Sequence, residues 1–109
     1  MSAQTQAANE PFVYPADVLE FAAKQGIVNR LEPLRQATVR AFPKGTLRIT
    51  FEPDAEREEL DAIVYEVTVK LADEPDQREA YRRWFDAVEG IMPKPSTIIE
   101  PILALRRVR

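Results

Sequence analysis

The spacing of apolar residues changes twice along this chain, and these changes constrain its fold more than any other feature. Up to Phe42-Pro43, apolar residues recur every three or four positions, which is typical of amphipathic helices. In two stretches between Thr46 and Leu71 they alternate with polar residues, which is typical of half-buried strands. The helical spacing returns after Asp76. Because 109 residues is the usual size of one compact domain, we predict a single α+β domain.

Two helices are predicted before the first change in spacing. The first runs from Pro15 or Ala16 to Gln25 and ends at Gly26, which can adopt a left-handed conformation. The second starts near Asn29, which forms a capping-box pattern with Glu32, and it ends at Phe42-Pro43. Residues 1–13 show no periodicity, so we predict a flexible tail followed by a single domain over 14–109. The predicted buried faces are Val18, Leu19 and Ala22 in the first helix and Leu31, Leu34, Thr38 and Ala41 in the second.

The alternating segment predicts two strands, over 46–52 and about 62–71. They are joined by the short acidic stretch PDAEREELD, so an antiparallel hairpin is the simplest connection. In the second strand, the residues predicted to share the buried face are Ile63, Tyr65, Val67, Val69 and Leu71.

A third helix and one further element complete the predicted order. Asp76 and Glu79 form a second capping-box pattern, and Gly90 follows a stripe made of Tyr81, Trp84, Phe85 and Val88. Residues 96–109 fit either a strand with Ile99, Leu103 and Leu105 inward, or a short helix capped by Thr97 and Glu100. We predict the strand, because it would cover an edge of the hairpin. The predicted fold is α+β in the order α-α-β-β-α-β, with an antiparallel sheet of two or three strands and helices packed on one face.

Two segments carry a resemblance to a group of known proteins. With LEPLRQATVRAFP (Leu31 to Pro43) and YRRWFDAVEGIMP (Tyr81 to Pro93) on either side of the hairpin, the chain resembles small uncharacterised bacterial α+β proteins. Those proteins have two N-terminal helices, a hairpin, an Arg-Trp helix and a closing strand. The resemblance implies an α+β fold and implies no activity, cofactor or site residue.

The composition excludes most familiar active sites. The chain has no Cys and no His, which removes disulfides, thiolate chemistry and the commonest general base and metal ligand. Its three Gly form no phosphate-binding loop, and no base accompanies Ser2 or Ser96. We therefore predict that the protein is not an enzyme and needs no cofactor. The N-terminus lacks the features of a signal peptide, so a cytoplasmic protein without membrane contact is predicted.

Charge is unevenly distributed and marks the candidate binding residues. Residues 45–79 carry four basic against eleven acidic side chains, whereas residues 80–109 carry six basic against three acidic. The acidic hairpin loop lacks the central Gly and the ligand register of a calcium-binding loop, so no metal is expected. The residues predicted to bind a partner are Glu52, Asp54, Glu56, Glu58 and Glu59 in the loop and Arg78, Arg82 and Arg83 on the third helix.

Three functional hypotheses follow from these observations. The first is an interaction or accessory protein that binds a protein partner, or a second copy of itself by adding strands at an open sheet edge. The alternative is a nucleic-acid-associated accessory protein that uses the Arg-rich helix and the Arg-rich C-terminus. The third is a carboxylate-based enzyme around Glu66, which shares a strand face with Lys70 and is predicted near Arg48. A cross-strand ion pair is the other interpretation of Glu66.

Overall fold

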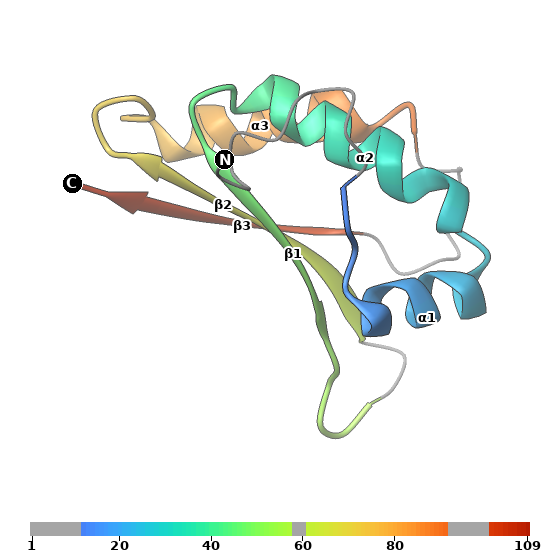
Figure 1. Ribbon diagram of the computed structural model, residues 1–109. Helices are drawn as coiled ribbons and strands as arrows, with labels where there is room; N and C mark the ends of the chain where they lie inside the picture. Colours follow the sequence, from blue (N-terminus) through green and yellow to red (C-terminus); the bar gives the residue numbers. More distant parts are fainter. Residues whose placement is uncertain (1–11, 58–60, 92–100) are drawn as a thin grey trace, which may run out of the picture.

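The structure, a computed structural model, describes residues 12–57, 61–91 and 101–109. Within these ranges, three helices and three strands follow one another in the predicted order, and the α+β class is confirmed (Figure 1). The closing segment is a strand, as predicted. The elements are α1 (Ala16–Gln25), α2 (Val28–Ala41), β1 (Thr46–Glu52), β2 (Ala62–Lys70), α3 (Gln77–Val88) and β3 (Ile102–Val108).

The sheet has the order β1-β2-β3, and it is mixed. β1 and β2 form the predicted antiparallel hairpin, with Thr46 opposite Thr68. β3 lies parallel to β2, with Leu103 opposite Tyr65, so the prediction of an antiparallel third strand is wrong. The reason is the intervening helix: α3 returns the chain to the starting end of β2, which is the crossover that parallel neighbours require.

One face of the sheet packs against the helices and forms the core. The predicted inward row of β2 is confirmed except at its end, because the strand stops at Lys70 and Leu71 is exposed. Leu103 of β3 is buried on the same side, whereas Ile99 lies outside the described residues. The core is filled by large side chains from both layers, chiefly Phe21, Leu31, Leu34, Ile49, Ile63, Tyr65, Val67 and Trp84.

Gly26 and Asp76 cap their helices as predicted, whereas the capping box predicted for α2 does not form. Gly26 has a φ of 71°, and the amide of Ile27 donates to the carbonyl of Ala22, as expected for a glycine-terminated helix. The Asp76 side chain accepts a hydrogen bond from the Glu79 amide at 3.1 Å and caps α3. The capping box predicted for α2 is wrong, because that helix starts at Val28 and no side chain caps it.

Two residues predicted to be buried lie at the border of their apolar stripe and are exposed. Leu19 of α1 is exposed, and the buried face of this helix uses Phe21 instead. Phe85 of α3 is 55% exposed, whereas Ala80 and Trp84 face the core. A small rotation of each helix about its axis decides whether such a border residue is buried or exposed. Helical spacing alone does not fix this rotation.

Candidate functional site

A groove of about 540 Å³ runs beside β1, at one edge of the sheet. One wall is β1 itself, from Leu47 to Glu52, and the other is formed by Phe12, Val13, Pro15 and Asp17. Within the described ranges, no hydrogen bond joins β1 to any segment other than β2. No described residue outside β2 thus pairs with the backbone of β1, and an edge strand of this kind can receive another strand. We call this site the edge groove.

The opposite edge of the sheet is partly covered. The backbone amide of Leu105 in β3 donates to the hydroxyl of Tyr81 in α3 at 3.4 Å. Arg107, near the end of β3, donates to the carbonyl oxygens of Glu74 and Pro75, just before α3. Because side chains and loops beside α3 contact β3 in this way, β1 is the more accessible of the two edge strands.

The outer wall of the groove is held by a cluster that joins residues 12–14 to α2. The Tyr14 hydroxyl donates to Glu32 at 2.8 Å, and the Arg35 guanidinium donates to both oxygens of the same carboxylate at 2.9 and 2.5 Å. The Arg35 guanidinium also lies 5.3 Å from the centre of the Phe12 ring. We call Tyr14, Glu32 and Arg35 the clamp, because their contacts position the wall that faces β1.

The charges of the clamp persist at neutral pH. Hydrogen bonds from the Arg35 guanidinium lower the pKa of the Glu32 carboxyl to about 2, so this group stays ionised. Burial raises the pKa of the Tyr14 hydroxyl, and the hydrogen bond to Glu32 raises it further. Tyr14 therefore remains a hydrogen-bond donor across the physiological range, and the clamp keeps the same bonding pattern.

The clamp predicts a stability change at acidic pH. The pKa of Glu32 is lower in the folded chain than its ordinary value of 4.5, so its stabilisation is present above pH 4.5 and is lost as pH falls toward 2. Glu32 is 44% exposed, and solvent screening limits the effect to about 1 kcal/mol. Urea unfolding should show Glu32→Gln less stable than the parent near neutral pH, with the difference vanishing at about pH 2.

Removing any surface carboxylate changes the stability of the domain to some extent, and a matched variant measures this background change. Glu20 is an exposed carboxylate of α1 outside the clamp, and Glu20→Gln is the control for Glu32→Gln. If the difference in stability between Glu32→Gln and the parent stayed unchanged down to about pH 2, the role assigned to the Glu32 carboxylate would be contradicted.

The acidic loop contributes one predicted residue to the groove. Glu52 lines its end, whereas Asp54 and Asp61 stabilise the loop: Asp61 accepts a hydrogen bond from the Asp54 amide at 2.7 Å. The Asp54 carboxylate accepts from the amides of Glu56 and Arg57, and these bonds lower its pKa. Glu56 is exposed, and Glu58 and Glu59 lie outside the described residues.

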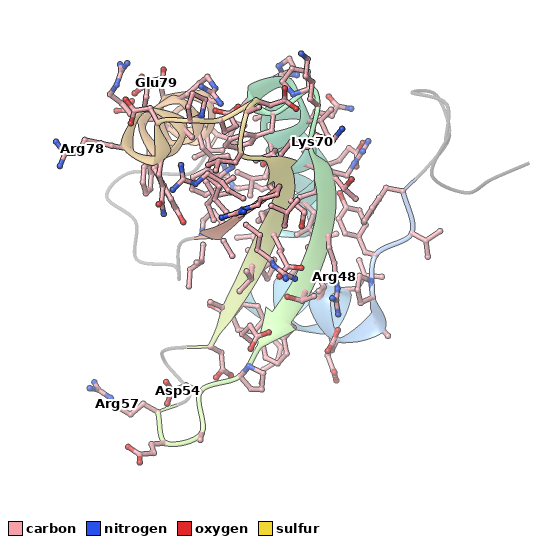
Figure 2. The ribbon with its side chains drawn as sticks, turned by 90° about the vertical axis from the view of Figure 1, so that its left-hand side faces the viewer. Arg48, Asp54, Arg57, Lys70, Arg78 and Glu79 are labelled. Carbon is pink, nitrogen blue, oxygen red and sulfur yellow. The ribbon has the colours of Figure 1, made fainter. Side chains whose placement is uncertain are left out.

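The predicted arginines lie far from the loop. Figure 2 shows Asp54 and Arg57 at one end of the molecule and Arg78 at the other, so the acidic and basic residues do not form one surface. Arg78 is exposed, and Arg82 pairs with Glu79 and Asp86 on its own helix. Arg83 is committed to contacts within the fold, because it binds the Glu74 and Glu79 carboxylates and the Ala41 carbonyl oxygen.

The remaining chemical candidates have ordinary structural explanations. Glu66 faces Arg48 across the hairpin at 3.8 Å, which confirms the cross-strand ion pair. No group of three or more potential metal ligands occurs among the described residues. A cavity inside the core, beside Tyr65, measures about 10 Å³, about the space of one water probe. Among the described helices, none combines the length and hydropathy that a membrane-spanning segment needs.

The outer wall of the groove is the part of the site that the sequence does not predict. Phe12 and Val13 fall in the predicted tail, and the local pattern carries no signal that Phe12 contacts Arg35, more than twenty residues away on α2. The alternation over β1 and the open edge are the signals that do point to this place. Comparisons with protein-family models, with curated proteins and with solved structures found no match to this chain. The site is therefore interpreted from its geometry.

Proposed function

We propose that this domain is a non-enzymatic interaction module that binds an extended segment of a protein by strand addition at the edge groove. The observation that carries the proposal is an accessible edge strand with a groove along most of its length. In strand addition, backbone hydrogen bonds provide affinity, and pockets for alternate side chains provide specificity. A groove beside a free edge has both features.

The chemistry of the groove favours a particular kind of segment. Apolar side chains of Leu47, Phe51 and Val13 line it, and Val13 is 85% exposed. Charged side chains of both signs also line it, from Asp17, Arg48 and Glu52. We therefore propose a partner segment with apolar residues at alternate positions and charged residues of both signs flanking them.

Two further observations support binding over catalysis. The chain has no His and no Cys, and the pKa values of Glu32 and Asp54 are lowered, which is opposite to the shift that a general acid requires. For the alternative hypothesis of nucleic-acid contact, fewer arginine side chains are available than the sequence suggests. Arg83 and Arg107 both donate to groups within the domain, which leaves Arg78, Arg82, Arg106 and Arg109 as its main candidates.

Selection from a random-peptide library tests the proposal. We expect enrichment of peptides with alternating apolar residues, and we expect the backbone amides of Thr46–Glu52 to gain protection from hydrogen exchange when such a peptide is added. Val13→Asp places a charge on the apolar wall, so it should weaken the binding of the selected peptides by about tenfold or more.

A matched variant controls for the added charge. Val28 is also an exposed valine, but it lies at the start of α2 and does not line the groove, so Val28→Asp should leave the affinity unchanged. Peptides that bind Val13→Asp as tightly as the parent, or protection confined to segments other than β1, would refute strand addition at this edge.

A further inference from the structure

We infer that the edge groove pairs with β1 of a second copy of this chain, in an antiparallel register centred on Thr50. This inference rests on the proposed function, because it names the segment that the edge receives. Its basis is the order of residues along β1, which is complementary to itself. On either side of Thr50 stand two apolar residues, Ile49 and Phe51, and beyond them stand the opposite charges of Arg48 and Glu52.

Antiparallel pairing about Thr50 places opposite charges across from each other and apolar side chains across from each other. Arg48 lies opposite Glu52 of the partner subunit, and the two-fold symmetry repeats this ion pair. Ile49 lies opposite Phe51 of the partner subunit, and this apolar pair is also repeated. A register centred on Ile49 would instead place Arg48 opposite Thr50 of the partner subunit and would pair no charges. Charge complementarity therefore selects Thr50 as the centre.

The same register also keeps the helices of both copies on one face of the joint sheet. Residues directly opposite each other in an antiparallel pair point to the same face of the sheet. Centring on Thr50 aligns the inward residues Ile49 and Phe51 of both copies, so both sets of helices cover the same face of a six-stranded sheet. A shift by one position in the pairing would set these apolar residues against outward polar ones.

The arrangement also closes on itself. A two-fold interface uses the same surface from both copies and leaves no second copy of that surface exposed. The other edges of the joint sheet are the two β3 strands, where Tyr81 already accepts a hydrogen bond from the Leu105 amide. The inference is therefore a closed dimer, without growth into longer assemblies through β1.

Cysteine cross-linking tests the register, because the natural chain contains no Cys. At the symmetry centre the two copies of Thr50 stand about 5 Å apart between Cα atoms, within the range of a disulfide. Thr46 lies on the same strand and face, but its two copies would be about 27 Å apart. Thr50→Cys should therefore form a covalent dimer under mild oxidation much faster than Thr46→Cys.

Charge exchange provides a second measurement that does not depend on cysteine. Arg48→Glu or Glu52→Arg alone places like charges opposite each other at both ion pairs, and sedimentation should show dimerisation weakened by about tenfold. The double variant Arg48→Glu/Glu52→Arg should restore it. Glu66→Gln removes the ion pair between Arg48 and Glu66 within one chain and should leave dimerisation unchanged.

The outcomes separate this inference from the proposed function. Rapid cross-linking of Thr50→Cys alone, with recovery in the double charge variant, supports the dimer. Equal cross-linking of both cysteine variants, no recovery in the double variant, or a monomeric parent at high micromolar concentration overturns it. Selected peptides that still bind the edge groove of a monomer would leave strand addition standing with a different protein as partner.

Discussion

Replacing Trp84 by alanine is expected to lower the free energy of unfolding by about 3–5 kcal/mol. Trp84 is only 1% exposed and lies where α3 packs on α2. Its indole N–H donates to the Thr38 hydroxyl at 2.9 Å, and that hydroxyl donates to the Leu34 carbonyl oxygen at 2.8 Å. Truncation therefore creates a cavity and breaks a buried hydrogen bond. Since a domain of this size has about 5–15 kcal/mol of stability, the loss should be visible as a large decrease in the urea midpoint.

The hydrogen bond and the ring volume can be separated by a double-mutant cycle. Thr38→Val leaves the Trp84 N–H without its acceptor and is expected to cost about 1–3 kcal/mol. Trp84→Phe removes the N–H and retains most of the apolar surface. If the two groups interact as the geometry indicates, the double variant will lose less stability than the two single variants added together.

The neighbouring aromatic residue is the control for this site. Phe85 is 55% exposed and touches Trp84 edge to face, with ring centres 5.3 Å apart. Phe85→Ala should cost about 1 kcal/mol at most. Equal losses for Phe85→Ala and Trp84→Ala would show that Trp84 is not the centre of the contact between α2 and α3.

Replacing Arg83 by alanine is expected to lower the free energy of unfolding by about 2–3 kcal/mol. Its guanidinium donates to the Glu74 carboxylate at 2.6 Å and to the Ala41 carbonyl oxygen at 2.9 Å, and it lies 5.1 Å from the centre of the Phe42 ring. Glu74 is only 14% exposed, so the variant leaves a largely buried carboxylate without its cation. Thermal and urea unfolding measure the loss.

Two variants distinguish the geometry of Arg83 from its charge. Arg83→Lys keeps the positive charge but cannot reach Glu74, Glu79 and Ala41 at once, so it should recover only part of the loss. Arg82 is 68% exposed, and Arg82→Ala should change stability by less than about 0.5 kcal/mol. A loss of similar size in Arg82→Ala and Arg83→Ala would contradict the structural role of Arg83.

Arg82 and Arg83 also show why the predicted binding residues were only partly informative. They are adjacent in sequence and equal in charge, so composition places both on a basic surface. In the fold, successive residues of a helix point about 100° apart, and Arg83 faces α2 while Arg82 faces solvent. Which of the two remains free for a partner depends on the orientation of α3, and the residues around them do not specify it.

In the edge groove, too, the sequence predicts one part of the site and the tertiary structure decides the other. Alternation over Thr46–Glu52 predicts a half-buried strand. The pairing of this strand with β2 follows from their nearness in sequence, because a short connection favours an antiparallel hairpin. The outer wall of the edge groove, by contrast, is not predictable from the sequence. Phe12 and Tyr14 carry no periodic signal, and they acquire their positions through contacts with Arg35 and Glu32 on α2.

The sequence by itself determined the class, the order of elements and most of the buried faces, because helical and strand periodicity are local properties of a few consecutive residues. Only the tertiary structure decided the parallel direction of β3, the accessibility of the β1 edge and the use of each arginine. These features depend on contacts between residues distant in sequence. The Trp84 N–H and the Thr38 hydroxyl, 46 positions apart, show the physical reason: such a pair forms only after α2 and α3 pack together.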